Sequence, residues 1–171
     1  SLSSDGRVVA IGAYLNDGNG NNSGHVRIYE NNGGSWSQIG QDIDGESAED
    51  QSGVGVSLSG NGNIVAIGAP YNNGNGNDAG HVRIFENIGG SWSQIGQDID
   101  GEAAGDNSGV SVSLSSDGSI IGIGAYGNSQ QAGHVRIFEN IGGSWIQIGQ
   151  DINGESAGDY SGYPLSLSSN G

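Results

Sequence analysis

One segment of this chain occurs three times without a gap, and this repeat constrains the fold more than any other feature. Residues 24–62 and 80–118 are identical at 31 of 39 aligned positions, and residues 133–171 match 80–118 equally well. The three histidines recur at spacings of 56 and then 53 residues. A period of about this length is typical of proteins that stack one supersecondary unit. We therefore predict one repeat array with units at approximately 1–56, 57–112 and 113–165, and residues 166–171 starting a fourth.

Short apolar runs inside each unit indicate β-strands. In the second unit, residues 54–59 alternate apolar and small polar side chains, as in a half-buried strand. Residues 63–69 (NIVAIGA) are almost continuously apolar, which is typical of a strand buried on both faces. Asn61-Gly62 between them is a strong hairpin signal, because both residues tolerate positive φ. Residues 81–86 and 91–99 supply two further strands.

No window of the chain has the periodicity of a helix. The predicted fold is therefore all-β, with tandem four-stranded antiparallel units of about 56 residues arranged as β-propeller blades. The alternative is an open β-solenoid or fibre of the same units.

The charge of the chain excludes several classes of partner. It carries 19 acidic and 4 basic residues, a net charge of -15. Such a surface repels nucleic acid and anionic membranes. No stretch approaches the roughly 20 apolar residues needed to span a bilayer. There is no cysteine, so disulfides and thiol chemistry are excluded.

Three motifs resemble the FG-GAP repeat of integrin α-type β-propellers. They are residues 109–125 (GVSVSLSSDGSIIGIGA), 66–70 (AIGAP) and 80–85 (GHVRIF). The resemblance implies propeller blades in a protein that is extracellular or at the cell surface, as in secreted bacterial surface proteins. We expect residue 1 to lie inside the array, with any targeting signal upstream. The calcium hairpin of that family survives only as Asp5-Gly6 and Asp117-Gly118, so no calcium is expected there.

The acidic segment between units is a better candidate for calcium. Closely spaced carboxylates around a turning glycine can supply several of the six to eight oxygens that calcium takes. The alternative is that the same residues form the turn, cap backbone amides or pair with arginine. The candidate ligands are Asp42, Asp44, Glu46, Asp50, Asp98, Asp100, Glu102, Asp106, Asp151, Asn153, Glu155 and Asp159.

Other side chains recur once per unit. Arginine suits bidentate pairing with a carboxylate, so the arginines are predicted to bridge to acids of neighbouring units, while the tryptophans pack between units. These inter-unit residues are Arg27, Arg83, Arg136, Trp36, Trp92 and Trp145. The histidines are also predicted to act as spacers between units, with a metal ring or a pH switch as the alternatives: His25, His81 and His134. Candidate glycan contacts are Tyr14, Tyr71 and Tyr126, and Asn21 begins the N-x-S sequon.

Catalysis has little support in this sequence. The histidines and acids occur as repeats rather than as one unique group, and the serines alternate along strands. We therefore predict a non-enzymatic extracellular scaffold with a structural or adhesive role. Its partner would be another copy of itself, by stacking or as a homo-oligomer, or a cell-surface protein or polysaccharide. The alternatives are a self-assembling extracellular filament subunit and a lectin-like, carbohydrate-binding propeller.

Overall fold

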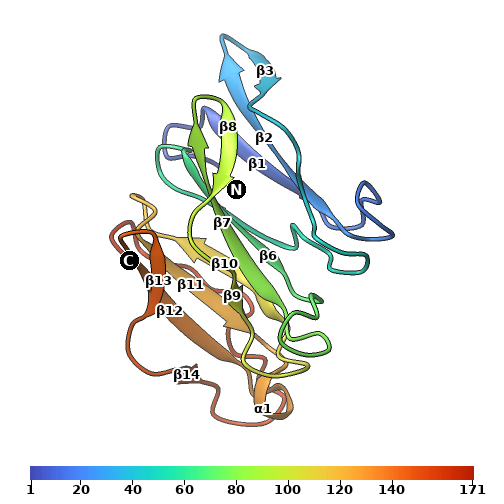
Figure 1. Cartoon of the computed structure of the whole chain (residues 1–171). Coiled ribbons are helices and arrows are strands. Elements are labelled where there is room, and N and C mark those ends of the chain that lie inside the picture. Colours follow the sequence, from blue (N-terminus) through green and yellow to red (C-terminus); the bar gives the residue numbers. More distant parts are fainter.

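The computed structural model describes residues 1–171, which form three antiparallel β-sheets (Figure 1). The first sheet contains β1 (Val8–Ala13), β2 (His25–Asn32), β3 (Ser35–Gln38) and β4 (Ile43–Asp44). The second contains β5 (Gly55–Leu58), β6 (Ile64–Ala69), β7 (His81–Ile88), β8 (Ser91–Gln94) and β9 (Ile99–Asp100). The third contains β10 (Ser108–Leu114), β11 (Ile120–Ala125), β12 (His134–Ile141), β13 (Ser144–Gln147) and β14 (Ile152–Asn153). The all-β prediction is confirmed.

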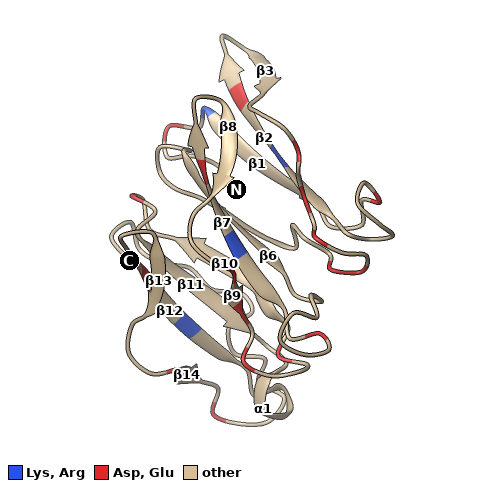
Figure 2. Cartoon of the chain, in the orientation of Figure 1, with Lys and Arg blue, Asp and Glu red and all other residues tan.

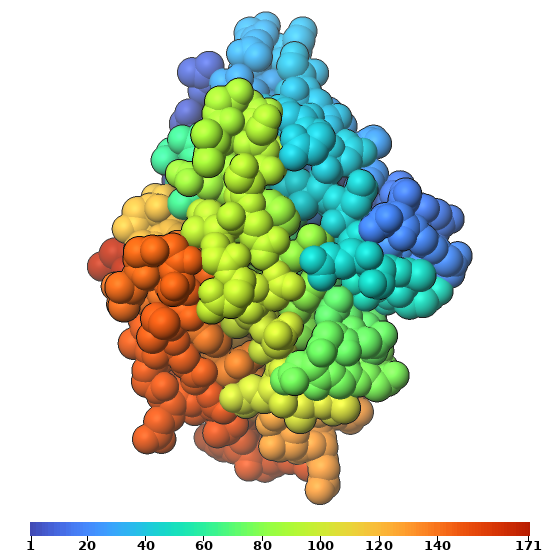
Figure 3. Space-filling model, viewed as in Figure 1, coloured from blue at the N-terminus to red at the C-terminus, as the bar shows by residue number.

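The second and third sheets follow the same order, and the first repeats it with a Leu2–Val9 bridge in place of the innermost strand, so that β1 corresponds to the second strands β6 and β11. We call the three sheets blades one, two and three. In blade two, β5 pairs with β6 and β6 with β7, and both β8 and β9 pair with β7. β5 and β10 contact each other, which makes them the innermost strands of the fan. In the space-filling view, blade two is wedged between blades one and three (Figure 3).

The fourth strand differs from the prediction. Residues 91–99 were expected to form one strand, but the ladder is interrupted between β8 and β9. Gly96 has a φ of +72°, a conformation that turns the chain out of the sheet. The other unexpected element is α1 (Asn128–Gln131), a short helical turn in the loop that is shortened in the third unit. No helix of the chain is long and apolar enough to cross a membrane.

The hydrophobic core lies between blades rather than inside any one of them. The first cluster joins Ala10, Val26 and Ile28 of blade one to Val65, Phe85 and Trp92 of blade two, among other residues. The second repeats this arrangement between blades two and three, where Trp145 takes the place of Trp92. Each blade is therefore stabilised by the apolar face of the next.

The backbones of successive blades come very close at glycine positions near the innermost strands. A Cβ added to Gly68 in β6 would lie 1.8 Å from the carbonyl oxygen of Gly109 in blade three. Gly12 and Gly124 have the same relation to Gly53 and Gly162. Only glycine permits this approach, so the spacing of the blades depends on these positions.

Candidate functional site

The largest cavity of the structure lies at one end of the innermost strands. It has a volume of about 640 Å³ and mostly apolar walls. Its lining comes from the loops that follow the second strand of each blade and from residues at or before each innermost strand. These residues are Tyr14, Gln51, Val54, Pro70, Tyr71, Val110, Tyr126, Tyr160 and Tyr163. We call this the tyrosine cavity; a concave apolar site with a few polar groups is the usual form of a ligand pocket.

Three tyrosines cluster at one wall of the tyrosine cavity. The ring centroid of Tyr126 lies 5.9 Å from that of Tyr160 and 6.1 Å from that of Tyr163. Burial, and then the neighbouring Tyr71 hydroxyl, raises the pKa of Tyr126 to about 12. The hydroxyl of Tyr126 therefore stays protonated at neutral pH and can donate a hydrogen bond to a ligand.

Two of these tyrosines were missed at the sequence level, although a signal was present. Tyr160 stands where the earlier units have Gln51 and Asn107, and Tyr163 stands where they have Val54 and Val110. Both therefore break the repeat, which is what a unique site in a repeat protein requires. The three predicted glycan contacts, Tyr14, Tyr71 and Tyr126, all line the same cavity. Whether they contact a glycan stays a prediction.

Eight of the predicted calcium ligands have one of three kinds of polar partner in the structure. Asp50, Asp106 and Asp159 cap their own turns, each accepting a hydrogen bond from the backbone NH three residues earlier. Asp42, Asp98 and Asp151 each accept a hydrogen bond from the glutamine four residues earlier. Glu46 and Glu102 extend toward the arginine of the next blade. Most acidic residues of the chain lie in loops rather than in strands (Figure 2).

The carboxylates and histidines gather into three groups whose donor atoms lie within 4.8 Å of one another. The groups are His25–Asp42–Asp44, Glu46–His81–Asp98 and Glu102–His134–Asp151. The donor spacing within each group is short enough for a shared metal ion. The predicted ligands that belong to no group are Asp50, Asp100, Asp106, Asn153, Glu155 and Asp159. Calcium at the predicted residues stays a prediction.

Burial lowers the pKa of His81, although Asp98 acts in the opposite direction. The imidazole of His81, which is 2% exposed, is therefore neutral at pH 7.

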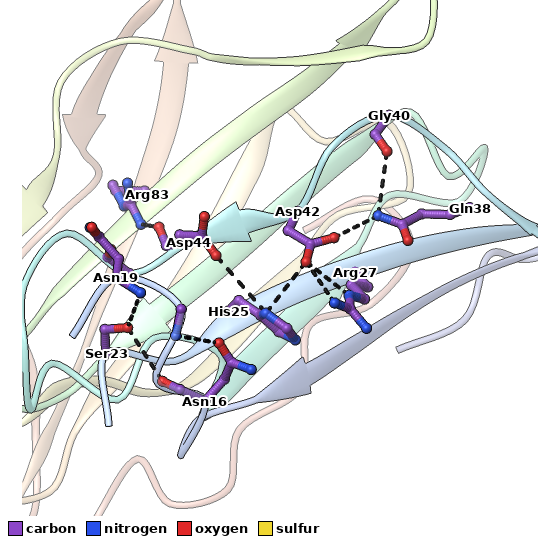
Figure 4. A network of polar contacts seen from close by, with 12 residues as sticks. Asn16, Asn19, Ser23, His25, Arg27, Gln38, Gly40, Asp42, Asp44 and Arg83 are labelled. Atoms are coloured by element: carbon purple, nitrogen blue, oxygen red, sulfur yellow. Dashed lines mark hydrogen bonds and ion pairs between the residues drawn. The ribbon is translucent and has the colours of Figure 1, made fainter. Parts of the chain in front are cut away.

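The arginines have two kinds of partner. Arg27 donates two hydrogen bonds to Asp42 of its own blade (Figure 4). Arg83 instead reaches back to blade one, where its Nη2 donates to the backbone carbonyl of Asp44 at 2.6 Å and its Nη1 lies 3.5 Å from Glu46. Arg136 repeats this contact with blade two.

The tryptophans divide in the same way. Trp92 donates from its indole nitrogen to the carbonyl of Ile39 in the preceding blade at 2.9 Å, and Trp145 donates to Ile95 at 3.0 Å. Trp36 of blade one makes no such contact in the structure and is 48% exposed.

The sequon at Asn21 lies in an exposed loop, where the Asn21 amide donates to Glu49. Its Ser23 is fully buried.

The arrangement of blades around innermost strands, with a cavity at one end of those strands, is that of a β-propeller. The chain is similar to three solved propeller structures. A putative 6-phosphogluconolactonase from Bacteroides uniformis has a TM-score of 0.62 and 16% identity, over 90% of this chain and 39% of that one. The periplasmic gluconolactonase PpgL of Pseudomonas aeruginosa has a TM-score of 0.52 and 19% identity, over 85% and 38%. TolB from Acinetobacter baumannii has a TM-score of 0.51 and 11% identity, over 87% and 31%.

The chain thus spans less than two-fifths of the length of these proteins. No family model matches the sequence. No curated protein matches it either. The likeness confirms the predicted propeller fold.

Two predictions are corrected by these neighbours. The FG-GAP assignment is wrong, because the similar structures are lactonase and TolB propellers rather than integrin-type repeats. The motifs that carried that assignment consist of glycine and apolar spacing, which packing imposes on propeller blades generally. The prediction of a non-enzymatic scaffold, with its adhesive, filament and lectin-like variants, is also contradicted, since two neighbours are named as lactonases.

Proposed function

We propose that this chain forms part of a lactonase-type propeller that hydrolyses a small cyclic ester in the tyrosine cavity. The observation that carries the proposal is the cavity itself, which is about 640 Å³ in volume, lined by five tyrosines and placed at the end of the innermost strands. A cavity of this size accommodates one small ligand. Two of the similar structures are named as sugar lactonases, which supports the choice of reaction.

The side chains of the tyrosine cavity fit a neutral sugar lactone better than a phosphorylated one. Aromatic rings offer flat apolar faces to a sugar ring, and their hydroxyls offer hydrogen bonds to its edge. No arginine lines the cavity. The net charge of -15 also disfavours an anionic substrate.

Tyr126 has the central chemical role in this proposal. Its protonated hydroxyl donates to the ester carbonyl oxygen and stabilises the negative charge that develops there as water attacks. The cavity lining includes no carboxylate or histidine. The reaction therefore depends on orientation and carbonyl polarisation, with hydroxide or water from solution as the nucleophile. The tetrahedral intermediate then collapses with cleavage of the ring C–O bond, and the alkoxide that forms takes a proton from solvent, giving the open hydroxy acid.

The test is the opening of glucono-δ-lactone by the purified chain, followed in a pH-stat above the spontaneous rate. We expect kcat/KM to rise with pH between 6 and 9 without levelling near 7, because the cavity lining contains no carboxylate or histidine that could act as a general base. Tyr126→Phe should lower kcat/KM about 100-fold, the effect of removing one such donor. Tyr29→Phe, outside the cavity, is the matched control. Lactone opening at the spontaneous rate, or equal effects of the two variants, would reject the proposal.

The location proposed for the protein is outside the cytoplasm. A periplasmic neighbour supports this proposal.

A further inference from the structure

We infer that the junctions between successive blades are binding sites for a divalent transition-metal cation, one held by Glu46, His81 and Asp98 and the other by Glu102, His134 and Asp151. In each site the glutamate comes from the loop after one blade, while the histidine and aspartate belong to the next. The cation therefore links two blades. None of these residues lines the tyrosine cavity, so the inference is independent of the proposed hydrolysis.

The spacing of the donor atoms fits an ion rather than hydrogen bonds. The Nδ1 atom of His81 lies 3.7 Å from the Oδ2 atom of Asp98 and 4.0 Å from the Oε2 atom of Glu46. Both distances are too long for a hydrogen bond. Donors about 2.0–2.2 Å from a tetrahedral ion lie roughly 3.3 Å apart. The donor atoms of the group lie within 4.8 Å of one another, so closing the site requires movements of about 0.4–1.5 Å. The side chain of Glu46 is 43% exposed; its Oε1 atom lies 3.5 Å from Nη1 of Arg83, and its other oxygen, Oε2, faces His81.

Unpaired imidazole nitrogens are the second observation. His134 is 1% exposed, and neither of its ring nitrogens has a hydrogen-bond partner. A buried polar group without a partner is destabilising, because it has given up its hydrogen bonds to water and gained none in return. A cation bound between Glu102 and Asp151 gives one of these nitrogens a partner.

The arginines explain why we expect two sites rather than three. In blade one, Arg27 donates from Nε at 3.0 Å and from Nη2 at 2.8 Å to the Oδ2 atom of Asp42 (Figure 4). This is the same oxygen that faces His25, so the guanidinium group of Arg27 already neutralises the carboxylate that a cation would need. In blade two, Arg83 turns to the preceding blade and leaves Asp98 without an arginine. Gln94 donates to the Oδ1 atom of Asp98, which leaves Oδ2 directed at His81.

The site in blade two opens on a polar cavity of about 460 Å³ with no hydrophobic residue in its lining. Asp50, Asp98 and Asp100 lie in its walls together with Glu46 and His81. The cavity therefore offers a path of entry, an attractive potential and room for the water ligands that complete the coordination shell.

The donor set decides the kind of cation. One imidazole nitrogen and two carboxylates suit zinc, cobalt or manganese, whereas calcium takes six to eight oxygens and no nitrogen.

Metal titration of the EDTA-stripped chain tests the inference. We expect two equivalents of Co²⁺ per chain in isothermal titration calorimetry, with visible absorption of nitrogen-coordinated cobalt, and displacement of Co²⁺ by Zn²⁺. Glu102→Gln should reduce the stoichiometry to one, and Glu46→Gln combined with Glu102→Gln should abolish binding. Both glutamates are substantially exposed, so these variants keep the fold.

Asp44→Asn is the matched control, because it changes the blade-one group that we expect to remain metal-free; it should retain two equivalents. No binding of Co²⁺, three equivalents, or an unchanged stoichiometry in Glu102→Gln would overturn the inference. Binding of Ca²⁺ without binding of Co²⁺ or Zn²⁺ would overturn it too, since that pattern excludes the imidazole ligand. None of these measurements depends on lactone hydrolysis, so the two proposals fail separately.

Discussion

Replacing Gly68 with alanine is expected to destabilise the chain by at least about 3 kcal/mol, among the larger effects of a single substitution. The new Cβ would lie 1.8 Å from the Gly109 carbonyl oxygen. The position of a Cβ is fixed by its own backbone, and the oxygen is a backbone atom, so no change of side-chain rotamer can relieve the clash. Blades two and three must therefore separate, and the apolar cluster between them loses its packing. The measurement is the free energy of unfolding in urea, followed by circular dichroism.

Gly122→Ala is the matched control for Gly68→Ala. Gly122 also lies in the second strand of its blade, at the position that Ala66 occupies in blade two. The nearest atom to its added Cβ is the Leu165 Cδ1 atom at 3.1 Å, which can move aside. Gly122→Ala should change stability by less than about 1 kcal/mol. Equal losses for the two variants would show that strand glycines matter through chain entropy rather than through blade contact.

Replacing Trp92 with alanine is expected to cost about 3–5 kcal/mol. The side chain is 5% exposed and packs in the cluster between blades one and two, and its indole nitrogen bonds to the Ile39 carbonyl. Alanine leaves a cavity and also removes the partner of that carbonyl. The loss is measured as the change in the free energy of unfolding, obtained from the midpoint and slope of urea denaturation.

Two further variants separate the causes at Trp92. Trp36→Ala removes the same residue type at the same position of blade one, where it is 48% exposed, and should cost less than about 1 kcal/mol in the single chain. Trp92→Phe keeps most of the apolar volume but removes the donor, so we expect a loss of about 1–3 kcal/mol. A loss at Trp36 as large as that at Trp92 would mean that burial between blades is not the source of the effect.

The local elements of the fold could be predicted because their signals are local. Residues 63–69 are apolar enough to specify a doubly buried strand, and the structure has β6 at Ile64–Ala69. The fourth strand was only partly predicted. Its polar and apolar residues continue from Ser91 to Ile99, but the positive φ of Gly96 breaks the ladder.

The sites could not be predicted because they depend on how blades meet. Arg27 and Arg83 lie in nearly identical sequences, yet one bonds within its blade and the other across to the preceding blade. The two differ in that Arg83 packs against blade one, whereas the structure has no blade against which Arg27 could pack in the same way. Glu46 and His81 belong to different units, and no pattern in either unit indicates that they meet. The tyrosine cavity likewise depends on the convergence of three blades, although Tyr160 and Tyr163 mark it by breaking the repeat.

The two blade interfaces are copies of each other, down to the tryptophan that bonds to an isoleucine carbonyl. A gene that encodes such an array can gain or lose one whole unit by unequal recombination between its repeats. The inserted blade would already fit both of its neighbours, so no compensating substitution is needed. The number of blades can then change one at a time while the residues at each interface stay the same.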